Sequence, residues 1–335
     1  MEDNIFKYGD KVEWSIPVLF GAEAVWTAIY RELTSVEINA PKVNVYGCPA
    51  CAWAGGRVPT IQSPIDSKII ETIFEYLKSC NATPVFTFTY TGVNKDSLND
   101  SYCNKLLDIA LQYDCKFIVY SDLLKDYIKN KSPKAFVTAS VIKPTNRFHG
   151  INKIEEATPE NETNYYNKLL KEYDMVVVRP EYSQTVLLEH PEYIDDISGI
   201  EVLINQTCIP NCPKAMEHYR FFERKREGFL YEPEPTPFRC LRKDIPDNVT
   251  SYRTNLLHTY NQVTKLVKTY GVKHLKIQGR GEPIPLIDLL YRIYTQIFNT
   301  DGSAYNTICN LPNALNQELN YINELHNKIN KNYPM

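Results

Sequence analysis

Eight short apolar runs recur along this chain of 335 residues, and each is followed by a segment with helical periodicity. Strands that are apolar throughout and alternate with helices are typical of a parallel sheet covered on both faces. Eight such units predict an α/β fold of the (β/α)8 TIM-like barrel type, with a doubly wound sheet as the alternative. The runs are residues 16–20, 43–47, 85–89, 117–120, 135–139, 175–178, 201–204 and 274–277.

Helical periodicity is clearest in two of the connecting segments. Residues 65–80 carry Ile69, Ile70, Ile73, Phe74 and Leu77 at helical spacing, and residues 252–270 carry a similar leucine and valine pattern. We therefore expect one helix in each segment.

The domain organisation follows from the same pattern. Residues 1–310 are expected to form a single barrel domain, and residues 311–335 a polar C-terminal helical extension. The connection between the seventh and eighth runs is long, with an expected helix at 214–226 and a proline-rich stretch at 232–237. Long ordered connections in a compact domain are usually functional.

The charge balance gives the chain no overall attraction to two classes of partner. Lys and Arg number 37 against 40 Asp and Glu, so no global charge attracts the chain to nucleic acid or to an anionic membrane. The N-terminal residues lack a basic segment followed by an apolar one, and no run approaches the roughly 18 apolar residues of a membrane span. We therefore expect a cytoplasmic protein with no membrane span.

The chain has 9 cysteines, which should stay reduced in that compartment and serve as metal ligands or as buried side chains. Four of them lie in or beside helical or strand patterns, and each is predicted to be a small buried side chain or a partly exposed thiol: Cys80, Cys103, Cys115 and Cys309. The other five follow strand ends or lie among Pro and Gly, where ligands usually occur. They are Cys48, Cys51, Cys208, Cys212 and Cys240.

In a barrel, all five of these cysteines leave the C-terminal ends of strands, which is the face where active sites are built. Four thiolates suit either a tetrahedral zinc ion or an iron–sulfur cluster. Zinc ribbons bring two short Cys-x-x-Cys elements together on a small module, whereas these cysteines are scattered along the chain. The spacing alone favours neither strongly, but ligands scattered over a barrel resemble cluster enzymes more. A cluster is therefore expected, with structural zinc and no metal as the alternatives.

Three ordered elements lie within residues 200–282. They are Asn205-x-x-Cys208-x-x-x-Cys212, Cys240-x-x-Lys243-Asp244 and residues 271–280, which end in Lys276-Ile277-Gln278-Gly279-Arg280. Together they resemble motifs of the peptidase U32 family. Gln278 stands where the family motif has Glu, so a carboxylate that could act as an acid or a base is missing. The sequence contains no Ser-His-Asp set, His-Glu-x-x-His helix or Cys-His protease signature, and the residues therefore give the peptidase label no support.

The resemblance implies a barrel-type fold. In members that act in oxygen-independent ubiquinone hydroxylation and in RNA hydroxylation, it also implies a 4Fe-4S cluster on four cysteines. The ubiquinone branch places a cysteine soon after a Tyr-x-Gly at an early strand end, a place that residues 46–51 occupy here. The resemblance thus implies the ligand set Cys51, Cys208, Cys212 and Cys240, with Cys48 as the spare.

Three further residues are candidates for catalysis or substrate binding. Lys276 and Arg280 end the eighth run, and Arg280 is suited to a substrate carboxylate or phosphate. His218 follows Cys212 on the expected helix, where it could transfer protons. An internal salt bridge for the two basic residues and a structural contact for His218 are the alternatives.

Together these features predict an oxygen-sensitive iron–sulfur enzyme of the redox or hydroxylation type, or an accessory subunit of one. A small anionic or aromatic molecule is its expected substrate, and an electron donor or partner subunit is its expected partner. A zinc-stapled or metal-free ligand-binding protein is one alternative, and a peptidase is another.

Overall fold

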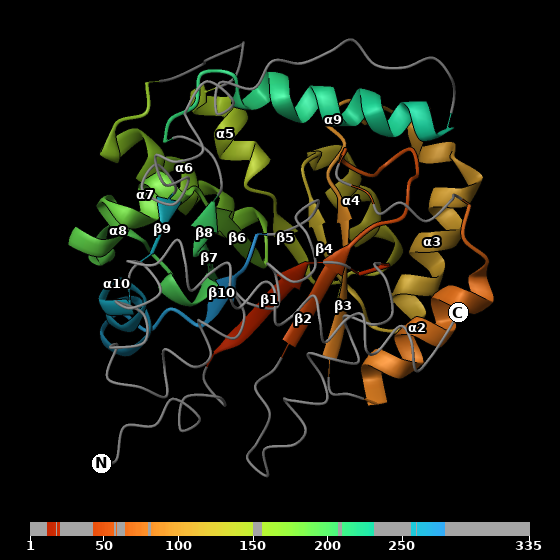
Figure 1. Ribbon diagram of the computed structural model, residues 1–335, viewed down its shortest axis with the longest axis horizontal. Helices are drawn as coiled ribbons and strands as arrows, with labels where there is room; N and C mark the ends of the chain where they lie inside the picture. The colour runs from red at the N-terminus through yellow and green to blue at the C-terminus, as the bar shows by residue number, and fades with distance from the viewer. Residues whose placement is uncertain are drawn as a thin grey trace, which may run out of the picture.

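The computed structural model describes residues 12–17, 19–20, 43–56, 58, 64–79, 82–149, 156–206, 210–230, 256–258 and 260–278. Within these ranges, eight parallel strands form a closed barrel in the order β1-β10-β7-β6-β5-β4-β3-β2 (Figure 1). Each predicted run overlaps one of these strands, so the (β/α)8 prediction is confirmed. The strands are β1 (Glu13–Pro17), β2 (Val43–Gly47), β3 (Ala82–Phe88), β4 (Lys116–Val119), β5 (Val137–Ala139), β6 (Met175–Val178), β7 (Ile200–Leu203) and β10 (His274–Lys276).

Helices surround the barrel, and local sequence sets where several of them begin. The side chains of Asp100, Ser121 and Thr158 each accept a hydrogen bond from a backbone N–H of the first helical turn, which caps α3, α4 and α6. Pro159 follows the third cap at a position where a missing N–H costs nothing. The helices are α2 (Ser67–Ser79), α3 (Ser101–Gln112), α4 (Asp122–Lys131), α5 (Ile142–His149), α6 (Pro159–Glu172), α7 (Pro180–Gln184) and α8 (Val186–Glu189).

The helix predicted at residues 65–80 is α2. Three of its five predicted face residues are buried, namely Ile70, Phe74 and Leu77. Ile69, by contrast, is 55% exposed. A helix face that packs on a barrel is narrower than the full set of apolar positions, so one of the two adjacent isoleucines points to solvent.

The long connection between β7 and β10 contains β8 (Asn205–Gln206), α9 (Ala215–Leu230), β9 (Leu256–Leu257), α10 (Tyr260–Thr264) and a π-helical turn (Lys265–Thr269). The helix predicted at 214–226 is confirmed as α9. The helix predicted at 252–270 is wrong at Leu256 and Leu257, because these residues pair antiparallel with Gln206 and Asn205. The predicted extension at 311–335 lies outside the described residues.

Polar side chains occupy the inside of the barrel at its N-terminal end. Glu13 of β1 accepts hydrogen bonds from Asn44 of β2 and Lys116 of β4, at 3.0 and 2.8 Å. Burial alone would raise the pKa of Glu13, but His274, whose Nδ1 lies 3.4 Å from Glu13 Oε2, and the charge of Lys116 outweigh it and hold this pKa well below its usual range. These contacts tie four strands together across the barrel interior.

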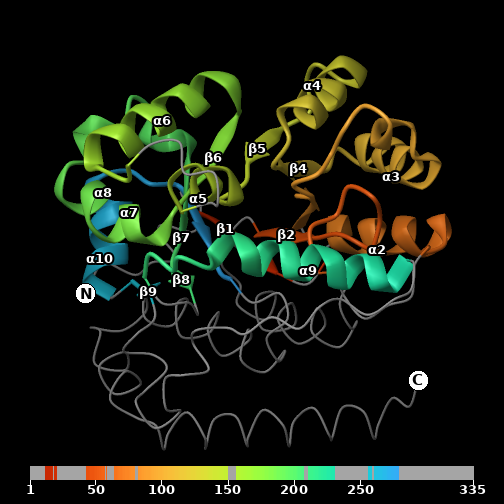
Figure 2. The ribbon, with the colours of Figure 1, turned by 90° about the horizontal axis from the view of Figure 1, so that it is seen from above.

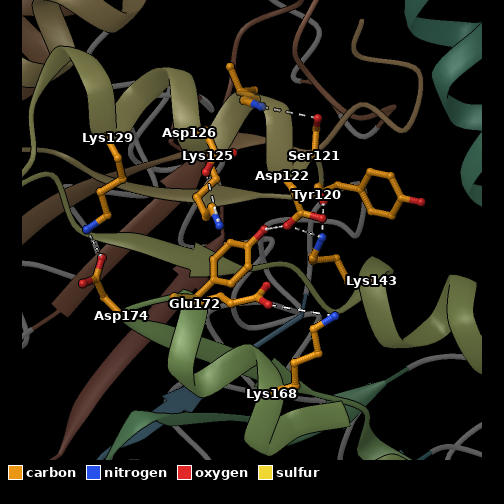
Figure 3. A network of polar contacts seen from close by, with 12 residues as sticks. Tyr120, Ser121, Asp122, Lys125, Asp126, Lys129, Lys143, Lys168, Glu172 and Asp174 are labelled. Atoms are coloured by element: carbon orange, nitrogen blue, oxygen red, sulfur yellow. Dashed lines mark hydrogen bonds and ion pairs between the residues drawn. The ribbon is translucent and has the colours of Figure 1, made fainter.

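A polar network also joins the outer layer at α4, α5 and α6 (Figure 3). Asp122 accepts hydrogen bonds from the Tyr173 hydroxyl at 2.5 Å and from Lys143 Nζ at 2.9 Å. Lys143 also donates to the carbonyl of Tyr120 at 2.9 Å. Burial alone would raise the pKa of Asp122, but the hydrogen bonds from Tyr173 and Lys143 outweigh it and lower this pKa.

Asp122→Asn is expected to lower the free energy of unfolding by about 1 kcal/mol. The effect is modest because the Asp122 side chain is 60% exposed and solvent screens the ion pair. Urea unfolding of the two proteins measures the difference. Asp126→Asn is the matched control, because this neighbouring aspartate is 64% exposed and pairs only with Lys125 among the described residues. An equal loss in both variants would contradict the importance of the network.

Candidate functional site at the barrel mouth

Helix α9 lies beyond the C-terminal ends of the strands (Figure 1) and crosses the end of the ring when the barrel is seen from above (Figure 2). The Glu223 carboxylate accepts hydrogen bonds from the Thr91 backbone N–H at 2.9 Å and from its hydroxyl at 2.7 Å. Arg226 Nη1 donates to the carbonyl oxygens of Cys51, Ala52 and Ala54, at 3.2, 3.2 and 2.7 Å. These contacts fix α9 over the opening at the C-terminal end of the barrel. We call this opening the mouth and helix α9 its roof.

The backbone of the loop after β2 approaches α9 closely at one glycine. A Cβ atom at Gly56 would lie 1.9 Å from the carbonyl carbon of Phe222. No side chain fits at that distance, so the roof can take this position only over a glycine.

Gly56→Ala is therefore expected to displace α9 and to speed tryptic cleavage at its exposed basic residues, Arg224 and Lys225, several-fold. The cleavage rate under native conditions measures this opening. Gly199→Ala is the control, because its Cβ would meet only the tip of the Leu170 side chain, which can move. Cleavage of Gly56→Ala at the rate of the unmodified protein would contradict the close contact.

Two cavities lie beneath α9. The outer cavity, near the start of the helix, is lined in part by Arg179, Cys212 and His218, and has about 530 Å³ of free space including its opening. The central cavity lies under the middle of the helix, is lined in part by Tyr46 and Lys276, and has about 670 Å³. Gln206, Tyr219 and Gln278 line both cavities, so the two are neighbours in one mouth.

Lys276, a predicted catalytic residue, lies at the floor of the central cavity. Its Nζ contacts Glu201 Oε2 of β7 at 2.9 Å and lies 4.1 Å from the centre of the Tyr46 ring. Glu201 also accepts a hydrogen bond from the Ser15 hydroxyl at 2.5 Å. The lysine is thus held by an internal ion pair, as in the structural alternative, while its side chain borders the cavity.

His218, the second predicted catalytic residue, lies on the first turns of α9 and lines the outer cavity. Its ring centre lies 4.8 Å from that of Phe222, four residues further along the helix. This contact orients the imidazole at the cavity wall. Arg280, the third predicted residue, lies outside the described residues.

The predicted cysteine ligands that the structure describes lie at two separate positions. Cys212 is buried and lines the outer cavity, whereas Cys208 and Cys240 lie outside the described residues. Cys51 and Cys48 are buried in the loop after β2, with their sulfur atoms 3.8 Å apart.

A third thiol, that of Cys103 on α3, contacts Cys51 from outside that loop. Burial alone would raise the pKa of Cys51, but hydrogen bonds from the thiols of Cys103 and Cys48 and from the backbone N–H groups of Trp53 and Ala54 lower it well below its usual range. The hydrogen bond to Cys51 in turn raises the pKa of Cys103. Cys103 was predicted to be a buried side chain, which is confirmed, but its contact with Cys51 was not predicted.

Helix α9 separates the two places. Cys212 precedes the start of α9, whereas the backbone of Cys51 is bound by Arg226, about 16 Å along the helix axis from Ala215. Within the described ranges, no group of three or more His, Cys, Asp or Glu side chains is arranged to hold a metal ion. The four-cysteine ligand set therefore stays a prediction.

Arg179 is a functional candidate that the sequence reasoning missed. It directly follows β6, is 2% exposed and lines the outer cavity. Its Nη2 donates to Asn211 Oδ1 at 2.8 Å, and its other nitrogens lie 3.6 Å from Glu162 and 3.5 Å from Glu181. A charged residue between an apolar run and Pro180 was the available signal, because charged groups at the C-terminal ends of barrel strands belong to the active-site face.

A serine–histidine pair bears on the peptidase alternative. The Ser183 hydroxyl lies 3.0 Å from His258 Nε2, and His258 Nδ1 lies 3.2 Å from the carbonyl oxygen of Ile204. Both side chains are fully buried, and neither lines the outer or the central cavity. The pair therefore anchors the connection between β7 and β10, and no substrate path leads to it from these cavities.

Burial lowers the pKa of His258 to about 4, below the value near 6.5 of an unfolded chain. The unfolded state therefore binds a proton that the folded state does not between these two pH values. Above about pH 6.5 His258 does not lower the free energy of unfolding. As the pH falls from there towards 4, this free energy decreases by about 1.4 kcal/mol per pH unit.

Urea unfolding from pH 4.5 to 7 should show that the free energy of unfolding of His258→Gln depends less steeply on pH than that of the unmodified protein. Equal slopes in the two proteins would contradict the assignment.

The comparisons with known proteins concern the fold. No family model and no curated protein matches the chain. Among solved structures, the chain is similar to "The Structure of the U32 Peptidase Mk0906", with 14% identity over 82% of this chain and 94% of that chain and a TM-score of 0.45. It is also similar to "The crystal structure of AsfvAP:AG", with 11% identity over 86% of this chain and 98% of that chain and a TM-score of 0.42. A structure named as a U32 peptidase is thus among those that resemble this barrel.

None of the described helices combines the length and the apolar content that a membrane crossing requires.

Proposed function

We propose that the mouth beneath α9 is the active site of an iron–sulfur barrel enzyme that acts on a small anionic molecule. The metal centre lies at the outer cavity and takes the thiolates of Cys208, Cys212 and Cys240. The observation that carries this proposal is the position of Cys212, which is buried in the wall of a polar cavity on the C-terminal face of the barrel.

Other groups around the mouth fit this function. A bound 4Fe-4S cluster would supply one-electron transfer. Buried Arg179 brings a positive charge for an anionic substrate, and His218 stands at the cavity wall as a group that can hold or release a proton. The Oε1 atom of Gln278 is buried and has no hydrogen-bond partner among the described residues, so it can accept a hydrogen bond from a substrate.

Cys51 is the ligand for which the sequence prediction and the geometry differ. Its lowered pKa favours the thiolate that a metal requires. Its described neighbours, however, are Cys48 and Cys103 and not Cys212. The fourth ligand is therefore treated separately from the other three in the experiment.

Protein purified without air from iron-replete cells is expected to be brown and to contain about four iron and four sulfide per chain. Cys212→Ala and Cys208→Ala should each lose most of this iron, because a missing thiolate leaves the cluster without a ligand. Iron and sulfide analysis with the visible absorption spectrum measures both results. A colourless, iron-free protein would overturn the proposal, and stoichiometric zinc without sulfide would replace it with the zinc alternative.

Two further variants complete the design. Cys115→Ala is the matched control, because this buried cysteine lies beside β4 and away from both cavities, and it should keep its iron. Cys51→Ala decides the fourth ligand. Retained iron is the result that the described geometry predicts, and lost iron would return Cys51 to the ligand set.

A further inference from the structure

Arg179 is held in an unusual way for a guanidinium that is 2% exposed. Its two carboxylate neighbours, Glu162 and Glu181, lie 3.6 and 3.5 Å away, which is beyond the range of good hydrogen bonds. Nη1 has no hydrogen-bond partner among the described residues. A buried charge whose hydrogen-bonding capacity is not filled is costly, so an oxygen ligand that filled it would be bound tightly.

The cavity beside Arg179 is built for an anion in two further respects. Ala215, the first residue of α9, lines the same cavity. Its N–H already donates to the Cys212 carbonyl at 3.1 Å, so the start of this helix of 16 residues contributes through its partial positive charge. The imidazole of His218 also lines the cavity, as does Thr145, whose hydroxyl donates to the Val141 carbonyl at 2.8 Å. These groups come from three elements of the barrel, and they surround one space.

We propose that the outer cavity binds the oxyanion group of a small molecule, a carboxylate or a phosphate, with the Arg179 guanidinium as its receptor. This inference rests on the proposed function only in taking the mouth as the substrate site, and it does not require a metal. The guanidinium matches the geometry of such a group because it presents parallel N–H donors. Asn211 Oδ1 already accepts a hydrogen bond from Arg179 Nη2 at 2.8 Å, and this contact holds the guanidinium fork, its planar set of N–H donors, in its orientation.

The two glutamates lie beside the guanidinium without filling its donors. Glu181 Oε1 accepts a hydrogen bond from the backbone N–H of Asn211 at 2.9 Å, so this carboxylate is tied to the loop and not to the guanidinium. Burial raises the pKa of Glu162 to about 7 although the charge of Arg179 opposes the rise. Neither carboxylate therefore fills the guanidinium donors, and with its pKa raised to about 7 Glu162 is only partly ionised near neutral pH.

The test is isothermal titration of the full chain, as purified without air, with two probes: malonate for the carboxylate and inorganic phosphate for the tetrahedral anion. At least one probe should bind, and the tighter one identifies the class of oxyanion. Arg179→Lys keeps the charge but removes the fork and should weaken binding by about tenfold or more. Lys225→Gln removes a positive charge from the solvent side of α9 and should bind as the unmodified protein does.

A second variant covers the case in which Arg179→Lys does not fold. Asn211→Asp places a carboxylate where Nη2 now donates, and Asp tolerates the positive φ of 51° at this turn as Asn does. It should therefore stay folded and weaken the binding by about tenfold or more, because the new carboxylate occupies the receptor. No binding of either probe at millimolar concentration, or unchanged binding by Asn211→Asp, would overturn the inference. An iron-free protein that binds a probe through Arg179 would support it while overturning the proposed metal centre.

Discussion

The pairing of β1 with β10 closes the barrel, and the rest of the structure depends on this closure. Glu13 pairs with His274 and Ser15 with Lys276, and backbone bonds continue the seam from Glu13 N–H to the Lys273 carbonyl at 2.7 Å and from Ile277 N–H to the Ser15 carbonyl at 2.9 Å. Because all eight strands are parallel, a closed ring puts every C-terminal end on one face. The mouth, its two cavities and the roof α9 all exist on that face because the ring is closed.

Part of the interior of this barrel is filled by charged side chains in place of apolar ones. Barrels of this type usually fill their interior with branched apolar side chains, whereas Glu201 and Lys276 form an ion pair here at the level of Ser15. Such a pair contributes little to stability on average, because removing two charges from water offsets their attraction. Its effect is positional, since it holds a cation against Tyr46 at the floor of the central cavity.

Helix α9 brings two parts of the chain that are far apart in the sequence into one site. Arg226 on α9 binds three carbonyl groups of the loop after β2, and Glu223 binds Thr91 after β3. The same helix begins just after Cys212, so its start lies at the outer cavity and its later turns lie over β2 and β3. Any chemistry at the mouth therefore takes place under a fixed cover.

The strands were predictable from the sequence because each one is a local apolar run, and buried parallel strands need little else. The contacts that build the site were not predictable, because they join residues far apart in the chain, such as Arg226 with Cys51 and Arg179 with Asn211. Leu256 and Leu257 fit a helical pattern equally well, and only their pairing with β8 makes them a strand. The cysteine motifs indicated which face of the barrel carries function, but they did not reveal that Cys51 contacts Cys103.

A metal centre is proposed at the Cys212 end of the mouth beneath α9. Anomalous diffraction at the iron edge, from crystals grown without air, locates this metal without reference to activity. One iron peak is expected beside Cys212 in the wall of the outer cavity. A peak at the Cys48, Cys51 and Cys103 thiols alone, or no iron peak in crystals of iron-replete protein, would contradict it.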